Sequence, residues 1–413
     1  MADLRTEVLQ LRRILAVSRE MATTTDLDHL LSLIIDTACE VLDCERATIF
    51  LYDPETDELY SRVAKGAAGI RFAANAGIAG IAVMHRECVN VADAYADPRF
   101  NRAVDKKTGF VTRNLLTFPL ENLDGHLIGV LQALNKRNGP FGAADEQLGH
   151  TLGAQAGVAL DRGRLIEEFA EKERMARDLD IARDIQSGLF PDAAPKISDF
   201  EVSGWNKPAD ECGGDTYDII PLADGRTLIA LADASGHGIG PALVVAQFHA
   251  LLRGMAFVTT DVARICEAVN HVLCQDLGDA RFVTAFIGIL DAKSHRLEYV
   301  SCGQGPILHV GQEVKSFVAT TYPLAIIPDM HVEPEVLEFA PRDILALFTD
   351  GFFEASNGKD ELFSEQRVIE HIAKHRNAPL QAIISSLHEA VDNFTRGNGQ
   401  NDDLTALLVR RTR

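Results

Sequence analysis

The stretch LIALADASGHGIGPAL, residues 228–243, predicts a buried strand that ends in a glycine-rich turn and continues into a helix. Its first residues form an unbroken apolar run, which is typical of a strand covered on both faces. Asp233 stands at the end of that run, so its carboxylate is expected at the edge of a sheet. Gly236 and Gly238 flank His237 and let backbone and ligand approach closely. We therefore interpret Asp233 as a site residue and His237 as a loop-shaping residue in preference to a general acid.

Three further segments repeat this context, in which an aspartate ends an apolar run beside a glycine or a second carboxylate. They are Asp215 in ECGGDTYDII, Asp350 in ILALFTDGFFEA, and Asp402 with Asp403 in GNGQNDDLTALLVR. Each segment alone is typical of a turn. Together they predict a cation site, because carboxylates within a few ångströms of each other repel unless a cation is bound. Oxygen ligands without a matching set of histidines or cysteines favour Mg²⁺ or Mn²⁺ over zinc.

The charge of the chain excludes several classes of partner. Its 413 residues hold 40 Lys and Arg against 60 Asp and Glu, a formal charge of −20. Nucleic acids and anionic membrane surfaces attract cationic proteins, so neither is expected as a partner. The seven cysteines show no C-x-x-C pairing, and no apolar run reaches the roughly 18 residues that span a bilayer. These features predict a cytoplasmic protein, and at roughly 150 residues per domain the length predicts two or three domains.

The first 160 residues predict an α+β module. An apolar seam at helical spacing opens the chain, formed by Leu4, Val8, Leu11 and Leu15. This seam is expected either to pack on the adjacent domain or to pair in a parallel coiled coil. A helix over 30–42, a hairpin around DPETDE, strands at ECVNVAD, NLLTFPL and HLIGVLQAL, and a closing helix over about 145–160 are expected to follow.

Residues 165–189 predict one long charged helix, because this segment holds no proline and only Gly188 as a breaker. A seam with alternating spacings of four and three runs along it through Met175, Leu179, Ala182, Gln186 and Leu189. A polar residue such as Gln186 in an apolar seam is typical of the register-setting positions of coiled coils. The alternative is a solvated linker helix. Beyond Pro191, strands alternate with turns, and helices are expected near 239–255, 260–277 and 380–395.

Five segments of the C-terminal half resemble one phosphatase family. In order, ARDIQSGLFP, GGDTYD, DASGHGIGPAL, TDGFFEA and DDLTALLV resemble the SpoIIE-type branch of the metal-dependent PPM (2C-type) serine/threonine phosphatases, over about residues 182–411. The resemblance implies an αββα sandwich with a two-metal centre at one edge of its two sheets. In such a centre the cations lower the pKa of a bridging water, which attacks phosphorus in line without a phosphoenzyme.

The resemblance also assigns roles to residues of this chain. Asp233 would bridge both metals with the Ala234 carbonyl nearby, Asp350 and Asp402 would complete one metal site, and Asp215 would serve the other. Asp218 and Asp403 would support these ligands or hold a further ion. In YVSCGQGPIL, Gln304 stands where the family usually has histidine, which affects any role of that histidine in substrate handling and leaves the metal site intact. Because all four main aspartates are present, an active enzyme is expected.

The N-terminal half resembles a GAF domain of the cyclic-nucleotide-binding type. The resemblance rests on IRFAANAGIAGIAV, on NVADAYADPRFNRAVDKKTGFVTRNLLTFPLENLDGHLIGVLQALNK, and on the NKxnFxxxDE pattern at Asn135, Lys136, Phe141, Asp145 and Glu146. Lys136 and Asp145 are able to form an ion pair that fixes the last strand to the following helix. The pattern alone therefore does not show nucleotide binding.

This second resemblance implies a ligand pocket with altered base recognition. The implied pocket residues are Ile78 and Ala79 through their backbone amides, Asp105, Thr108 and Thr112 on the purine and phosphate side, and Gln132 in place of an acidic residue. Ala64 and Lys65 replace a Phe-Asp pair that reads the base in some members, and Asn101 replaces an aromatic residue. Cyclic AMP, cyclic GMP, another small ligand, and a dimerisation module without ligand all remain open.

These observations predict four parts: an N-terminal helix (1–22), a GAF sensor domain (23–162), a helical coiled-coil linker (163–190) and a SpoIIE-type PPM phosphatase domain (191–413). The predicted function is a ligand-regulated serine/threonine phosphatase with two Mn²⁺ or Mg²⁺ ions. Its predicted substrate is a phosphorylated STAS-domain anti-sigma-factor antagonist, and the protein is expected to be a homodimer. One alternative is a scaffold that binds ligand and docks STAS proteins. Another keeps the two-metal site for a phosphodiester or a small molecule.

Overall fold

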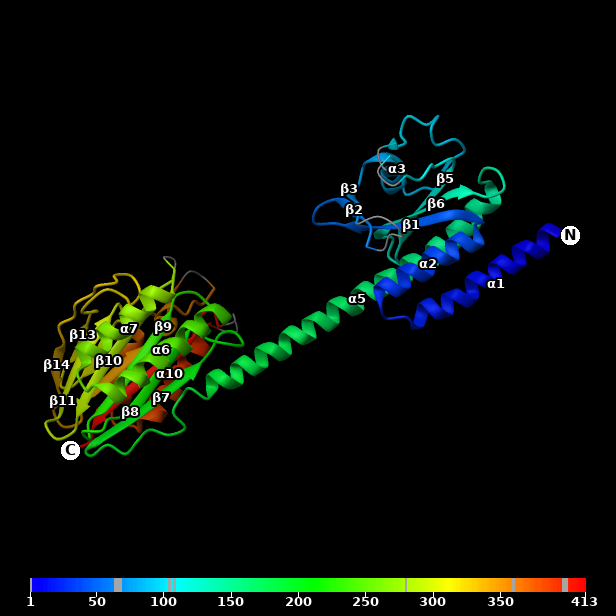
Figure 1. The fold of residues 1–413 in the computed structure, drawn as a ribbon. Coiled ribbons are helices and arrows are strands. Elements are labelled where there is room, and N and C mark those ends of the chain that lie inside the picture. The colour runs from blue at the N-terminus through cyan, green and yellow to red at the C-terminus, as the bar shows by residue number, and fades with distance from the viewer. Residues whose placement is uncertain are drawn as a thin grey trace. The chain divides into compact units, whose positions relative to one another are not determined.

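The computed structural model describes residues 2–62, 69–102, 105–106, 109–278, 281–358, 361–395 and 400–413. The chain forms two compact units, residues 1–175 and 176–413 (Figure 1). One helix, α5 (Ala143–Ser187), passes through the boundary between them. Two helices were predicted here, over 145–160 and 165–189. They are continuous because Gly163 does not break the helix: its bare backbone packs on α2, where an added Cβ would lie 3.3 Å from side chains of Leu27 and Leu30.

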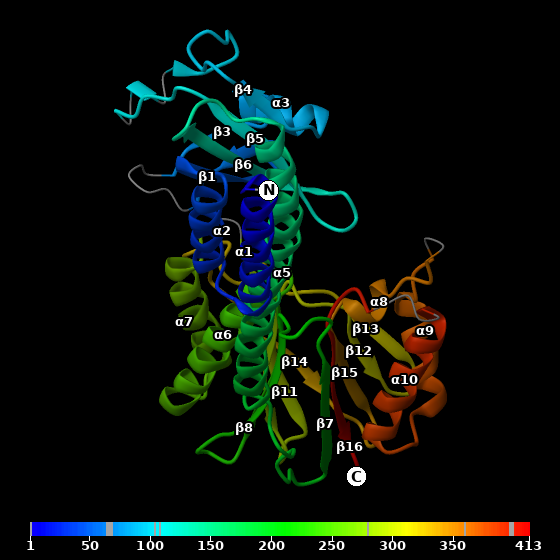
Figure 2. The ribbon, with the colours of Figure 1, turned by 90° about the vertical axis from the view of Figure 1, so that its right-hand side faces the viewer.

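The first unit is built on a six-stranded sheet in the order β3-β2-β1-β6-β5-β4. Its strands are β1 (Cys44–Asp53), β2 (Glu58–Tyr60), β3 (Arg71–Ala73), β4 (Val89–Val91), β5 (Leu115–Glu121) and β6 (Leu127–Lys136). The helices α2 (Leu27–Val41) and α5 cover one face, and α3 (Gly77–His85) lies on the other (Figure 2). The predicted hairpin around DPETDE is confirmed, since β1 pairs with β2 across that turn.

The N-terminal helix α1 (Ala2–Thr23) packs on α2 within this unit. Ile14, Val17 and Met21 are buried on its inner face, and Arg13 forms an ion pair of 2.9 Å with Glu40. Packing on the adjacent domain was one of the two predicted alternatives. Leu15 of the predicted seam is nevertheless 67 % exposed. The packed face therefore differs from the predicted one at this position.

The second unit is an αββα sandwich, as predicted. Its sheets have the orders β14-β11-β10-β9-β8 and β13-β12-β15-β16-β7. The first holds β8 (Asp215–Pro221), β9 (Thr227–Ala234), β10 (Val283–Asp291), β11 (Arg296–Cys302) and β14 (Glu335–Glu338). The second holds β7 (Phe200–Lys207), β12 (Ile307–Val310), β13 (Val314–Phe317), β15 (Ile344–Phe348) and β16 (Leu404–Arg411). All pairs are antiparallel.

Helices cover the outer faces of both sheets. They are α6 (Ile239–Val258) and α7 (Val262–Asp276) on the first sheet, and α8 (Gly351–Glu354), α9 (Ser364–His375) and α10 (Leu380–Thr395) on the second (Figure 2). Apolar side chains such as Ile229, Phe286 and Leu407 fill the space between the sheets. Alternation along each strand directs one set of side chains between the sheets and the other set toward the helices.

Two further features concern α6 and the cysteines. Within the described part of the chain, α6 is the one helix long and apolar enough to cross a bilayer, and its inner face is buried against the first sheet through residues such as Val245 and Phe248. All seven cysteines are free thiols, and four of them are buried.

Candidate metal centre and ligand cavity

The predicted aspartates meet at one edge of the sandwich. On the first sheet, Asp215 pairs directly with Asp233, and both lie at the end of their strands. On the second sheet, Asp350 follows β15, while Asp402 and Asp403 precede β16. β15 and β16 are paired, and the Thr349 amide donates to the Thr405 carbonyl at 3.0 Å. The two facing sheets thus present their aspartates to the same edge.

These carboxylates disfavour one another's charge. Burial raises the pKa of Asp233 to about 8, and the charges of Asp350 and Asp402 add to the rise. Burial and the neighbouring Asp233 raise the pKa of Asp215. Burial likewise raises the pKa of Asp350 and of Asp403. A cation that neutralises the cluster would remove this conflict, so the electrostatics favour cation binding.

The donor set fits a hard divalent cation in its chemistry. It offers carboxylate oxygens from two sheets together with the carbonyl of Ala234, which ends β9. Among the described residues, no three His, Cys, Asp or Glu side chains are close enough to enclose one ion. Ligation therefore requires the carboxylates to close in on the ion.

Two threonines that sequence reasoning missed hold Asp215. The hydroxyls of Thr349 and Thr405, both on the second sheet, donate to Asp215 Oδ2 at 2.7 and 2.6 Å. Thr405 also donates its amide to Thr349 Oγ1 at 3.0 Å. These contacts join the sheets beneath the site and fix the orientation of the carboxylate. The sequence did contain a signal for these two threonines, because each lies within two residues of a site aspartate.

Asp403 holds the loop that leads into β8. Its carboxylate accepts the amides of Ala209 at 2.7 Å and Gly214 at 2.5 Å. An added Cβ at Gly213 would lie 2.5 Å from Asp403 Oδ2, and one at Gly351 would lie 2.1 Å from the Asp403 carbonyl oxygen. Only glycine fits positions with such a close approach. The two glycines next to the aspartates are therefore required by packing at this edge.

Gln304 joins the two sheets at the same edge. Its side chain is buried, accepts from Thr284 Oγ1 at 3.0 Å and donates to the Phe348 carbonyl at 2.8 Å. Thr284 pairs with Asp233, and Phe348 lies two residues before Asp350. The glutamine that departs from the family pattern is thus a structural link beside the aspartates.

His237 lies in the loop after Asp233. Gly236 and Gly238, which flank it, both have positive φ, of 94° and 85°. The imidazole is largely exposed, and its Nδ1 lies 3.3 Å from the carboxylate of Asp210. This geometry agrees with a loop-shaping role.

Asp218 faces away from the aspartate cluster. The alternation of β8 places Asp218 opposite in direction to Tyr217, which lies between the sheets, so Asp218 points toward α6. Arg253 of α6 donates to both of its oxygens, at 2.7 and 3.0 Å, and His249 lies 3.1 Å away. These partners lower the pKa of Asp218 against the effect of its burial. Asp218 therefore fastens α6 to the sheet and does not face the predicted metal site.

We expect Arg253→Met to destabilise the second unit by about 2–3 kcal/mol, measured by urea unfolding, because it leaves the buried Asp218 carboxylate without its main partner. The double variant Arg253→Met/Asp218→Asn should recover part of this loss, since it removes the unpaired charge. Equal stability of wild type and Arg253→Met would contradict the assignment.

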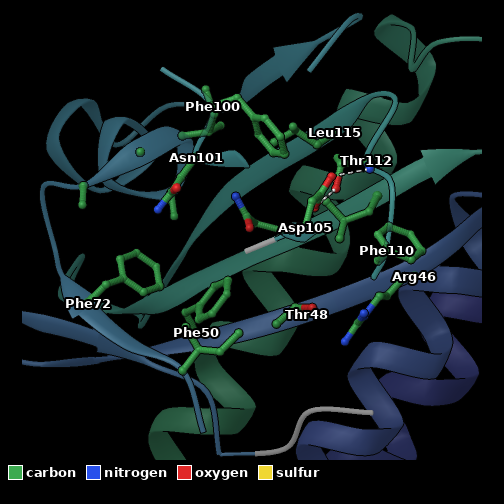
Figure 3. A pocket seen from close by; sticks show the side chains of 17 residues that line it. Arg46, Thr48, Phe50, Phe72, Phe100, Asn101, Asp105, Phe110, Thr112 and Leu115 are labelled. Atoms are coloured by element: carbon green, nitrogen blue, oxygen red, sulfur yellow. Dashed lines mark hydrogen bonds between the residues drawn. The ribbon is translucent and has the colours of Figure 1, made fainter. Parts of the chain in front are cut away.

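A cavity in the first unit gathers the predicted ligand residues (Figure 3). Its lining includes Ile78 and Ala79 of α3, Asp105, Thr112, and Gln132 of β6. The predicted Thr108 and the altered positions Ala64 and Lys65 lie outside the described residues. Sequence reasoning missed the lining residues Arg46, Thr48, Phe50, Phe72, Phe100 and Phe110. Four aromatic rings and one guanidinium suit a flat ligand that carries an anionic group.

Asp105 and Thr112 form an internal clamp on the cavity wall. The Asp105 carboxylate accepts the amide of Thr112 at 2.7 Å, its hydroxyl at 2.9 Å, and the hydroxyl of Tyr95 at 3.1 Å. Both side chains are buried. The clamp therefore shapes the cavity from within. Nearby, Lys136 and Asp145 form the expected ion pair, at 2.7 Å.

The end of α5 contacts the loop that leads into Asp215. Gln186 donates its amide to the Gly213 carbonyl at 2.5 Å and accepts the Gly213 amide at 3.0 Å, while Arg183 donates to the Glu211 carbonyl at 3.0 Å. The predicted seam residues Leu179 and Gln186 are half-buried, and the Leu179 carbonyl accepts a hydrogen bond from the Cys212 thiol. Gln186 therefore binds this chain's own loop in place of the partner helix that its position in the seam suggested.

Comparison with known proteins gives a match to each half of the chain. A family model for Stage II sporulation protein E (SpoIIE) matches residues 223–412, and a GAF domain model matches residues 26–160. The solved SiaA-PP2C domain of Pseudomonas aeruginosa shares the fold, with a TM-score of 0.52 and 24 % identity, over 58 % of this chain and 98 % of that one.

Two curated relatives match parts of the chain. Protein IcfG of Synechocystis sp. is 26 % identical over 263 residues, 57 % of this chain and 41 % of the relative. A probable 3′,5′-cyclic phosphodiesterase, pde-5 of Caenorhabditis elegans, is 31 % identical over 165 residues, 37 % of this chain and 22 % of the relative. The chain thus spans less than half the length of either relative. Sequence, fold and family models agree that the chain joins a GAF domain to a SpoIIE-type phosphatase domain of the PP2C fold.

Proposed function

We propose that the chain is a metal-dependent serine/threonine phosphatase that acts in the cytoplasm on a phosphorylated STAS-domain protein. The observation that carries this proposal is the convergence of Asp215, Asp233, Asp350 and Asp402 at one edge of the sandwich, with pKa values raised for the first three by burial and mutual repulsion. The SpoIIE family match supports the same reaction class.

Each residue of the edge has a defined part in this reaction. When bound, two Mn²⁺ or Mg²⁺ ions supply an activated water and offset charge on the phosphoryl oxygens. Asp233 and the Ala234 carbonyl would hold them from β9, with Asp350 and Asp402 on the second sheet and Asp215 on the first. Thr349 and Thr405 keep Asp215 oriented. Asp403 fixes the loop that precedes Asp215 and is the remaining candidate ligand.

The test is hydrolysis of a phosphoserine peptide by the full chain with Mn²⁺, with Mg²⁺ and with EDTA. The proposal expects phosphate release that depends on the divalent cation. Release of a nucleoside monophosphate from cyclic AMP or cyclic GMP, without peptide hydrolysis, would favour the phosphodiester alternative. Binding of a STAS-domain protein with no hydrolysis of either substrate would favour the scaffold alternative.

We further propose that a ligand in the GAF cavity regulates the phosphatase through α5. Ile70, which lines the cavity, exchanges hydrogen bonds with Ser61, through its carbonyl at 2.8 Å and its amide at 3.0 Å. The next residue, Arg62, binds Glu167 of α5 through two hydrogen bonds, of 2.9 and 3.1 Å. At its other end, α5 holds Gly213 through Gln186. A rotation or shift of this continuous helix therefore acts on the loop that precedes Asp215.

Pairing of two α5 helices in a homodimer supplies a bistable element for this regulation. Apolar side chains remain exposed along the helix, at Leu165, Phe169, Met175, Ile181 and Ile185. Exposed apolar positions along a long helix favour association with a second helix. The arrangement supports a homodimeric coiled coil as part of the proposal.

Calorimetric titration of the full chain with cyclic AMP and cyclic GMP tests the sensor. We expect one of them to bind and to change the rate of peptide hydrolysis. Thr112→Val should weaken that binding by at least about tenfold and abolish the change in rate, because it breaks the clamp with Asp105. Thr151→Val, at an exposed site on α5, is the matched control. Unchanged nucleotide activation in Thr112→Val would refute this regulation.

A further inference from the structure

Exposed apolar side chains gather beside the metal centre on the first sheet of the second unit. We call the group formed by Ile239, Leu243, Phe282 and Ile326 the edge patch. Ile239 and Leu243 lie in the first turns of α6, directly after the loop of Asp233. Leu243 is 67 % exposed, although the two residues that follow it are buried in the core. Besides the side that faces the core, α6 thus has a second apolar side, which no described residue covers.

Hydrogen bonds place Phe282 and the segment of Ile326 beside the loop that follows Asp233. Ser235, two residues after Asp233, donates its amide to the Phe282 carbonyl at 3.0 Å, and its hydroxyl accepts the Phe282 amide at 3.1 Å. Val283 and Leu324 exchange backbone hydrogen bonds of 2.8 and 3.1 Å, which brings Ile326 beside the start of β10. The patch therefore borders the segment that carries Asp233.

Arg281 adds positive charge to this surface. Its guanidinium lies 3.2 Å from the position that a Cβ on Gly240 would take, so it is next to the first turn of α6. The side chain is exposed. A surface that combines apolar side chains with a cation suits a partner that combines apolar side chains with an anion.

We propose that the edge patch docks the polypeptide that carries the phosphorylated residue, through apolar side chains that flank the phosphoserine or phosphothreonine. This inference rests on the proposed phosphatase function. A phosphoryl group at the aspartate edge brings its own chain to the border formed by Ser235 and Phe282. The patch then selects substrates with apolar neighbours, and it lets the enzyme favour one phosphoprotein over others by contacts outside the metal centre.

Pairs of phosphoserine peptides that differ only in two flanking residues test this docking. One peptide of each pair carries two leucines and the other two serines, and the pair is scanned from two to five residues on either side of the phosphoserine. At the position that reaches the patch, wild type is expected to show a kcat/KM at least about tenfold higher for the leucine peptide. Equal values at every position would overturn the docking proposal, whereas absence of hydrolysis of all peptides would refute the phosphatase function itself.

Two substitutions in α6 test whether the edge patch causes the preference for the leucine peptide. Leu243→Glu should reduce the leucine preference to about onefold, since it removes apolar contact and places a carboxylate in the patch. Val258→Glu, on the same helix but at its other end and 77 % exposed, is the matched control and should keep the preference. An equal loss in both variants would overturn the proposal. A change in molar mass of Leu243→Glu relative to wild type in light scattering would assign the patch to contact between copies of the chain and would also overturn it.

Discussion

Asp233→Asn is expected to lower Mn²⁺-dependent hydrolysis of a phosphoserine peptide by at least about 1,000-fold, because a neutral amide would not replace the carboxylate that is proposed to hold both cations. Asp233 lies on β9, an interior strand of its sheet. It pairs with Asp215, and the charges of Asp350 and Asp402 act on it. The loss should appear in kcat at saturating Mn²⁺. Isothermal titration should show weakened Mn²⁺ binding in the same variant.

Asp224→Asn is the matched control for this experiment. Asp224 lies in the turn between β8 and β9, at the end of these strands away from the site, and it binds Arg226 at 2.8 Å. This variant should retain wild-type hydrolysis. Activity of Asp233→Asn within about tenfold of wild type would contradict the role proposed for Asp233.

The EDTA-treated protein is expected to become less stable as the pH rises from about 4 to about 8. In the folded state the pKa of Asp233 is raised from 3.8 to about 8, and the pKa of Asp215 is raised as well. A carboxyl group whose pKa is raised by folding contributes stability that is complete below its unfolded pKa and is lost as the pH rises through the folded value. Calorimetry should give a melting temperature for the second unit at least about 5 °C lower at pH 8 than at pH 5.

Divalent cations and substitution should both remove this dependence. Mg²⁺ or Mn²⁺ should raise the melting temperature more at pH 8 than at pH 5, because bound cations favour the ionised carboxylates. In EDTA, Asp233→Asn should narrow the difference between the two pH values. If the wild type and this variant showed the same dependence on pH, the cluster would not be its source.

Much of the second unit could be predicted from its sequence. The strands that end in aspartates have local signals, and the helices expected near 239–255, 260–277 and 380–395 correspond to α6, α7 and α10. α9 was not predicted, although Val368 and Ile372 mark its buried face.

In the first unit, α3 gives little helical signal, because its segment GIAGIAVMH is apolar on all sides and holds two glycines. Periodicity cannot identify such a helix.

Contacts between distant segments could not be predicted. Thr349 and Thr405 meet Asp215 only because the two sheets face each other, and sequence spacing carries no record of that pairing. Gln186 shows the same limit: its seam position favoured a partner helix, but it binds the backbone of Gly213, which any residue type would offer. In the cavity, Arg46 and Phe110 become lining residues through the orientation of their segments, which residue type does not reveal.

The Gln304 link also affects how this edge responds to pH. A histidine at that position would change its charge between about pH 5 and pH 8, and its bonds to the two sheets would change with it. An amide keeps the same donor and acceptor throughout this range, so its bonds to Thr284 and the Phe348 carbonyl persist. These bonds therefore hold the two sheets together at the aspartate edge independently of pH in this range. At this edge the aspartates, whose pKa values are raised, are the groups that respond to pH.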